Sequence, residues 1–178
     1  MSEPEIQQCP LAPEGLLSKR AWVAVDDQGN ALSVLATLQM SLHDPQRMKD
    51  CALYTTPSRR REKLATRLFH RARADLAAET PPVALEWSGI ATPGGYKLAK
   101  SLGFSISDEQ SAKIGAVLDE RLAENPDDEH LRSHAALRVA SGGRLPYNPL
   151  NQEKADRAGR KALREAAEAL QLHVVEEG

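Results

Sequence analysis

The stretch TTPSRRREKLATRLF, residues 55–69, places three consecutive arginines where a helix begins. From Arg59 to Arg73 the chain carries seven basic residues and one acidic residue, Glu62. A helix amino terminus already presents unpaired N–H groups and the positive end of the helix dipole, so cations are the less favoured residues there. A bound anion would offset this unfavourable positive charge. A strand followed by a cationic turn and a helix start is a common arrangement for binding phosphate. The alternative is a solvated helix face, on which arginines are ordinary.

Residue patterns on both sides of this stretch predict alternating strands and helices. Residues 21–40 read as a β-hairpin around the turn DDQGN, because apolar residues alternate with more polar ones from Leu32 to Met40. CALYT (residues 51–55) and VALEWSG (residues 83–89) are further strand candidates. Apolar residues at helical spacing predict a helix over residues 60–79. They are Leu64, Leu68, Ala72 and Leu76.

The chain changes character after Phe104, which defines three predicted regions. Residues 1–19 contain three prolines and read as an irregular lead-in. Residues 20–106 form the α/β core, whose last helix ends at Gly103 in the segment TPGGYKLAKSLGF. Residues 107–178 form a three-helix extension, which begins with Ser107 and Gln110 at capping-box spacing.

Composition limits the classes of function. The chain has 178 residues, of which 41% are hydrophobic and 27% charged, and a formal net charge of -2. We therefore expect a globular protein with no overall attraction to nucleic acid. The sequence contains no apolar run long enough to span a bilayer, and MSEPEIQQCP lacks the pattern of a signal peptide, so we expect a cytoplasmic protein. Cys9 and Cys51, the two cysteines, do not make a disulfide framework.

The segments LYTTPSRRREKLATRLF and TPGGYKLAKSLGF together resemble the GCN5-related N-acetyltransferase (GNAT) family. The core of that family is a strand, a V-x-P-x-x-R-x-x-G-x-G/A turn, a helix, another strand and a helix that ends in Leu-Gly-Phe. Here the proline falls on Pro57, the arginine on Arg60 and the closing small residue on Ala65, while Lys63 stands where the family has its first glycine. The resemblance implies an α/β fold with a GNAT-like mixed central sheet flanked by helices.

The resemblance also implies acetyl-CoA, or another acyl-CoA, as co-substrate. In the family the turn and the helix start bind the pyrophosphate of the coenzyme, which places it on the N–H groups from Arg61 to Ala65. The cofactor-binding residues expected from this match are Thr55, Arg60, Arg61, Lys63, Ala65, Thr66 and Thr92. The side chain of Lys63 would either crowd the phosphates or contact them through its ammonium, and the sequence leaves both possibilities open.

The implied catalytic residues depart from the family pattern. The places where the family often has an asparagine and a tyrosine hold Thr92 and Ala99. Tyr96, one helical turn before Ala99, is the candidate general acid, and packing is its alternative role. Glu86 is the candidate base, with a salt-bridged strand face as its alternative, and Asp50 is a weaker candidate.

Two functions follow as hypotheses. The first is an acyl-CoA-dependent N-acyltransferase that transfers an acetyl group to an amine acceptor by direct attack in a ternary complex. The second is a GNAT-like protein without the chemistry, for example a phage or mobile-element structural component that docks a protein partner on its C-terminal helices. Fold analogy alone does not decide between them.

One further pair of residues stands outside this scheme. His130 and His134 are four residues apart on a predicted helix, which places both imidazoles on one face. Because no third ligand accompanies them in a known spacing, we expect solvated helix residues, with a metal site as the alternative.

Overall fold

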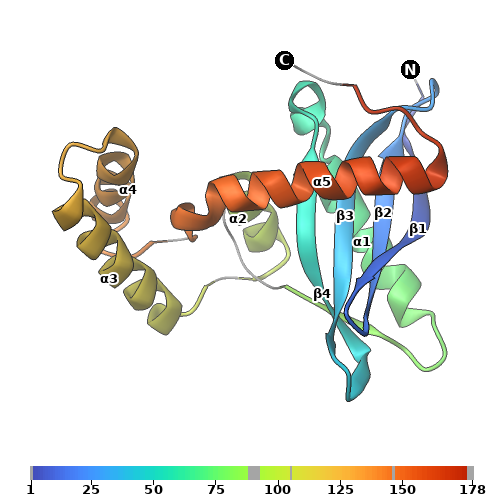
Figure 1. Cartoon of the computed structure of the whole chain (residues 1–178), viewed down its shortest axis with the longest axis horizontal. Coiled ribbons are helices and arrows are strands. Elements are labelled where there is room, and N and C mark those ends of the chain that lie inside the picture. Colours follow the sequence, from blue (N-terminus) through green and yellow to red (C-terminus); the bar gives the residue numbers. More distant parts are fainter. Residues whose placement is uncertain (1, 88–92, 105, 146, 176–178) are drawn as a thin grey trace. The chain divides into compact units, whose positions relative to one another are not determined.

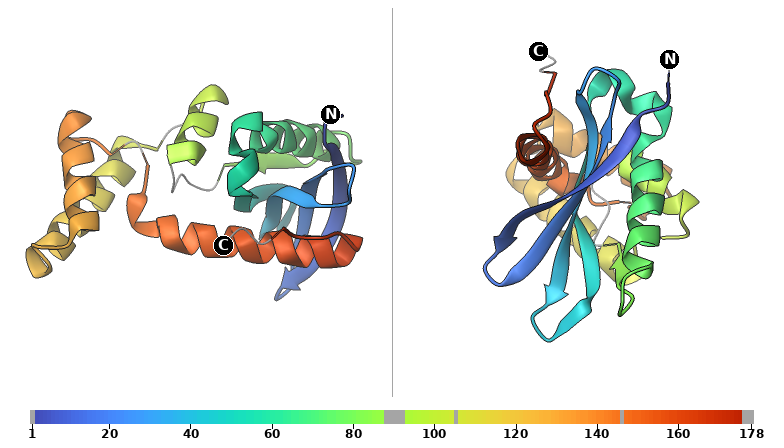
Figure 2. Two further views of the ribbon diagram at one scale, coloured as in Figure 1. Left: turned by 90° about the horizontal axis from the view of Figure 1, so that it is seen from above. Right: turned by 90° about the vertical axis from the view of Figure 1, so that its right-hand side faces the viewer.

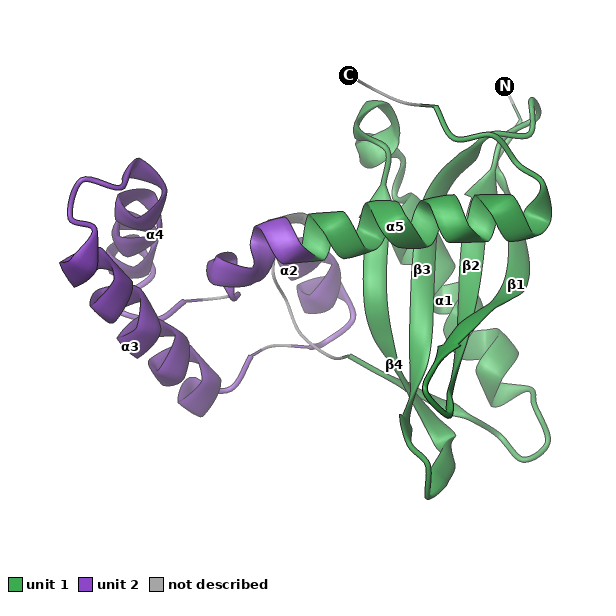
Figure 3. Ribbon diagram, viewed as in Figure 1, with its two compact units in different colours: residues 1–88, 155–178 green, residues 89–154 purple. Residues whose placement is uncertain are grey.

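The computed structural model describes residues 2–87, 93–104, 106–145 and 147–175. The chain divides into two compact units (Figure 3). The sheet unit comprises Met1–Ser88 and Ala155–Gly178, and the helical unit comprises Gly89–Lys154. The three C-terminal helices are therefore shared between the units, because most of the last helix belongs to the sheet unit.

The sheet unit is built on five strands in the order β1-β2-β3-β4-β5 (Figure 1). Strands β1 to β4 are antiparallel to their neighbours, and β5 is parallel to β4. The strands are β1 Glu5–Glu14, β2 Leu17–Val25, β3 Ala31–Ser41, β4 Asp44–Thr55 and β5 Ala84–Glu86. This mixed sheet flanked by helices confirms the predicted fold class.

The predicted irregular lead-in is wrong over β1. Glu5–Glu14 pairs along β2, with Cys9 opposite Ala21. The prolines at positions 10 and 13 suggested a break, but β1 is an edge strand, and an edge strand tolerates prolines where no neighbour needs their N–H groups. The side chain of Cys9 is buried and extends the core to this edge.

The predicted hairpin is confirmed as β2 and β3. Both carboxylate oxygens of Asp26 hold its turn, because Oδ1 accepts bonds of 2.9 Å from the N–H groups of Gln28 and Asn30 and Oδ2 accepts a bond of 3.0 Å from the Asn30 amide. The sequence predicted one better-buried face for β3, whereas every residue from Ala31 to Leu38 is buried. The reason is that helices cover both faces of the sheet (Figure 2).

Helix α1 (Leu64–Ala77) covers one face and leads from β4 to β5. It lies inside the predicted range 60–79. Its buried residues are Leu64, Leu68, Phe69, Ala72 and Leu76. This stripe is the helical repeat that the sequence shows, so burial of these side chains holds the helix on the sheet.

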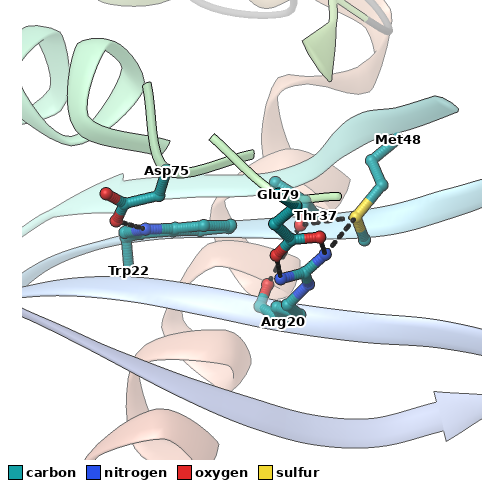
Figure 4. Close-up of polar contacts among 6 residues, drawn as sticks. All are labelled: Arg20, Trp22, Thr37, Met48, Asp75 and Glu79. Atoms are coloured by element: carbon teal, nitrogen blue, oxygen red, sulfur yellow. Dashed lines mark hydrogen bonds and ion pairs between the residues drawn. The ribbon is translucent and has the colours of Figure 1, made fainter. Parts of the chain in front are cut away.

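Two polar contacts fasten the far end of α1 to β2 (Figure 4). The indole N–H of the fully buried Trp22 donates to Asp75 Oδ2 at 2.9 Å. Arg20 pairs with Glu79, just beyond the helix, through two bonds, one of which joins Nη2 to Oε2 at 3.0 Å. The same Nη2 also donates to the sulfur of Met48 at 3.8 Å.

Helix α5 (Gln152–Leu170) covers the opposite face with small residues. Ala162, Leu163, Ala166 and Ala167 pack in one core cluster with side chains of β1, β2 and β3. Gly159 approaches β4 so closely that a Cβ built on it would lie 2.6 Å from the Cβ of Tyr54. After the helix, His173 forms a single parallel bridge with Asn30.

The helical unit contains α2 (Pro93–Ser101), α3 (Asp108–Glu124) and α4 (Glu129–Ala140). Gly103 has a φ of 82° and ends α2 as the sequence predicts. The predicted capping box is present, because Ser107 and Gln110 each accept a bond of 3.1 Å from the other's backbone N–H. Leu118, Leu131 and Leu145 form the small core of α3 and α4. Over the part of the chain that the structure describes, no helix is long and apolar enough to cross a membrane.

Candidate functional site

The turn between β4 and α1 brings together most of the predicted cofactor-binding residues. It consists of a 3₁₀ helix, Pro57–Glu62, followed by Lys63 in the left-handed conformation with φ 56° and ψ 31°. A left-handed backbone is unfavourable for a residue with a Cβ, by roughly 1–2 kcal/mol. Lys63 stands where the GNAT turn pattern has its first glycine. It therefore adopts, at that position, the backbone conformation that glycine favours.

The start of α1 leaves its backbone donors open. Lys63 stands at the N-cap position without a side-chain cap, and the first turn contains no acidic residue. The first intrahelical bond runs from Arg67 N to Lys63 O at 3.2 Å. Among the described residues, nothing accepts a bond from the N–H groups of Ala65 and Thr66. These free amides and the helix dipole create a positive electrostatic potential in front of the amino terminus of α1.

Carboxylates neutralise the cations of this segment unequally. Three arginines have partners, since Arg59 pairs with Glu62, Arg67 with Glu3 and Arg71 with Asp75. In the described part of the chain, Arg60, Arg61 and Lys63 form no ion pair, and all three are exposed. The unpaired positive charge is therefore concentrated in residues 60–63, directly before the open amides.

Arg60 is folded back onto the end of β4. Its Nε donates to the carbonyl of Thr55 at 3.1 Å, and its guanidinium lies 5.7 Å from the ring centroid of Tyr54. The hydroxyl of Thr55 bonds across the sheet to Ser33 at 2.8 Å. These contacts position the guanidinium beside the turn without neutralising its charge.

The hydroxyl of Thr56 is a feature that the sequence analysis missed. Thr56 is 4% exposed, and its Oγ1 has no hydrogen-bond partner among the described residues. A buried hydroxyl without a partner costs about 1–3 kcal/mol. Because Thr56 directly precedes Pro57, this hydroxyl is a second unsatisfied polar group at the entry to the turn. The Thr-Pro pair in the sequence gives no signal for it.

Strands β4 and β5 separate on the approach to this turn. Their pairing ends at Lys49 and Glu86, whereas β4 continues to Thr55. The register against β3 shifts between Ala36 and Thr37, which leaves Cys51 as the extra residue of a β-bulge. Because a bulge bends its strand, β4 changes direction just after its last pairing with β5.

Four side chains of β4 and β5 bear on the chemistry of the site: Arg47, Asp50, Cys51 and Glu86. Arg47 Nη2 donates to both carboxylate oxygens of Glu86 at 2.9 Å, and this bond raises the pKa of the Arg47 guanidinium. Burial raises the pKa of the Cys51 thiol to about 11, so it is not a thiolate at neutral pH. Asp50, the weaker base candidate, is buried.

Tyr96, the remaining predicted residue that the structure describes, lies in the helical unit. Tyr96, on α2, contacts Tyr147 with ring centroids 6.2 Å apart. Burial raises the pKa of the Tyr147 hydroxyl. Thr92 lies outside the described residues. The structure thus groups six of the predicted cofactor residues in the sheet unit and places Tyr96 in the other unit.

Comparisons with known proteins give one structural match. A solved "tandem GNAT protein from the clavulanic acid biosynthesis pathway", without acetyl-CoA, is 21% identical to this chain with a TM-score of 0.42. The match covers 55% of this chain and 31% of that one. No family model matches the sequence, and no curated protein does. At this identity and TM-score, the fold assignment rests on the strand order and the helices described above.

Proposed function

We propose that the turn at residues 57–63 and the start of α1 bind the diphosphate of an acyl-CoA. The observation that carries this proposal is the combination of open amides at Ala65 and Thr66 with three unpaired cations directly before them. A diphosphate would accept from those N–H groups and would neutralise that charge. The left-handed conformation of Lys63 supports the assignment, because the chain turns at this residue, between the arginines and the open amides.

On this basis we propose an acyl-CoA-dependent N-acyltransferase, which transfers the acyl group, an acetyl group in the simplest case, to an amine. The coenzyme supplies a thioester whose acyl carbon is attacked by the amine. Glu86 would accept the proton that the amine loses, and the departing sulfur would take up a proton from solvent. The amide bond that forms replaces the thioester bond that breaks, so the products are the acylated amine and free coenzyme A.

One observation favours the alternative of a non-catalytic GNAT-like binding protein. Both carboxylate oxygens of Glu86 accept bonds from Arg47. This pairing occupies the carboxylate oxygens that a base would use. Such a protein would bind the coenzyme or a protein partner without releasing thiol.

Calorimetry with acetyl-CoA on the full chain tests the binding proposal. We expect saturable binding that Arg60→Glu and Arg61→Glu abolish, because each places a negative charge beside the diphosphate. Arg164→Glu is the matched control, since Arg164 is an exposed residue of α5, which covers the opposite face of the sheet. Absence of heat at millimolar acetyl-CoA, or equal binding by all the variants, would refute the proposal.

Release of coenzyme A thiol in the presence of a panel of primary amines separates the two functions. The enzyme hypothesis expects amine-dependent release that Glu86→Gln reduces while acetyl-CoA binding persists. Binding of acetyl-CoA without any thiol release would favour the non-catalytic alternative.

A further inference from the structure

Two histidines of α4 converge on one point of the helical unit. His130 and His134 lie one helical turn apart, and their Nε2 atoms are 3.0 Å from each other. The ring centroids are 4.3 Å apart, and the ring planes cross at 78°. His134, which the sequence analysis expected to be solvated, is buried at 8% exposure, whereas His130 is exposed. One ring of the pair therefore lies in the interior of the helical unit, and the other lies at its surface.

The burial of His134 follows from the face of α4 that it shares with Leu131. Leu131 packs in the core formed with Leu118 and Leu145, and His134 is one turn further along the same side. A neutral imidazole is the form that binds metal ions, because its unprotonated nitrogen carries the lone pair.

The separation of the two nitrogens suits a shared metal ion. Nitrogens that are each about 2.0–2.1 Å from one ion lie about 2.9 Å apart at a right angle and about 3.4 Å apart at the tetrahedral angle. The observed 3.0 Å falls between these values and close to the first. Binding of one ion by both Nε2 atoms would require each ring to carry its proton on Nδ1.

The surroundings define what kind of site this is. Among the residues that the structure describes, no group of three or more His, Cys, Asp or Glu side chains is placed to hold a metal. The nearby carboxylate of Asp128 is engaged at the start of α4, where it accepts a bond from Leu131 N at 3.1 Å. Two protein ligands with water completing the coordination make an open, exchangeable site, in contrast to the closed four-ligand sites of structural zinc.

We propose that His130 and His134 bind one divalent first-row transition ion of the nickel, copper and zinc group through their Nε2 atoms. Imidazole ligands select this group over magnesium and calcium, which prefer oxygen. The ion clips adjacent turns in the first half of α4, so its binding stabilises the helical unit. This inference is independent of acyl-CoA binding, because it rests on different residues in the other unit.

Calorimetry and thermal unfolding with nickel chloride test the site, on the full chain without a histidine tag. We expect one Ni²⁺ per chain at the tightest site and a rise in unfolding temperature that grows with Ni²⁺ concentration. His130→Ala should remove both effects, and because His130 is exposed its replacement leaves the core unchanged. His70→Ala is the matched control, since His70 is an exposed histidine on α1 and its loss should change neither effect.

Three results would overturn the proposal. If the wild-type protein does not bind Ni²⁺, the two rings form only a hydrogen bond. Undiminished binding by His130→Ala places the ion elsewhere. An equal response to Mg²⁺ shows that the ion is not selected by imidazole. Copper electron paramagnetic resonance gives a second readout, in which coupling to two nitrogens is expected for the wild type and for His70→Ala.

Discussion

The starts of α1 and α3 differ in every feature that stabilises a helix terminus. Helix α3 begins with a complete capping box at Ser107 and has two acidic residues in its first turn. Helix α1 begins at the left-handed Lys63, has no side-chain cap and no acid in its first turn, and follows three arginines. A start that is unfavourable by itself is expected where a ligand completes it, so the contrast supports the proposal that α1 binds the diphosphate.

The far end of α1 compensates for its open start. The bond from Trp22 to Asp75 and the pair of Arg20 with Glu79 hold that end on the sheet. The amides at the other end remain free for a ligand, while the helix as a whole keeps its position. Substitutions at either end of α1, or at the cap of α3, therefore test the difference between the two helices.

The largest effect on stability is expected from Asp75→Leu. The change leaves the indole N–H of the fully buried Trp22 without an acceptor and should lower the free energy of unfolding by about 1–3 kcal/mol. Asp75→Asn retains an acceptor and should lose less. Chemical denaturation of both variants measures the difference, and equal losses would show that the bond to Trp22 does not fasten α1.

Removal of the α3 cap should cost less. Ser107→Ala deletes the acceptor for the Gln110 N–H and should lower the free energy of unfolding by about 1 kcal/mol. Lys63→Ala removes no cap from α1, so it should cause no comparable loss. Denaturation curves that show the same loss for both substitutions would contradict the difference between the two helix starts.

Lys63→Gly should increase stability. The left-handed conformation costs Lys63 roughly 1–2 kcal/mol, and the greater freedom of glycine in the unfolded chain offsets roughly 0.4–1 kcal/mol of the gain. We expect a net increase of about 0.5–1 kcal/mol in the free energy of unfolding. Lys63→Ala is the control, because alanine keeps the Cβ; if it stabilised the fold as much as glycine, backbone strain would not be the cause.

The smallest effect concerns pH. The hydrogen bond from Arg20 lowers the pKa of Glu79 below its usual value. A lowered pKa in the folded state stabilises the fold above the unfolded value, and this stabilisation is lost as pH falls through the folded value. Since both side chains are partly exposed, Glu79→Gln should cost at most about 0.2–1 kcal/mol at pH 7. The difference from wild type should shrink below about pH 4; a difference that persists there would exclude this pair as its source.

Local patterns predicted the elements of the fold well, because periodicity and caps are local properties. The helix stripe from Leu64 to Leu76, the Ser107 capping box and the Gly103 stop all appear where the sequence places them. The strand β1 was missed because its prolines are acceptable only at a sheet edge, and position in a sheet is not local. The burial of β3 on both faces likewise depends on α5, more than 110 residues later in the sequence.

The candidate site was predictable in part. The arginines and the Pro57 turn are visible in the sequence, and the structure groups them with Lys63, Ala65 and Thr66 at the start of α1. Which cations lack carboxylate partners depends on contacts such as that of Arg67 with Glu3, far away in sequence. The unsatisfied Thr56 hydroxyl and the pairing of Glu86 with Arg47 also arise only when the strands assemble.

The most direct test transfers the acidic character of the α3 start to α1. Thr66 is the third residue of α1, so Thr66→Glu places a carboxylate beside the open amides, and Thr66→Gln is its uncharged control. We predict that Thr66→Glu raises the free energy of unfolding by about 0.3–1 kcal/mol and abolishes acetyl-CoA binding, whereas Thr66→Gln keeps binding. Acetyl-CoA binding by Thr66→Glu that equals that of wild type would contradict the claim that a diphosphate completes the start of α1.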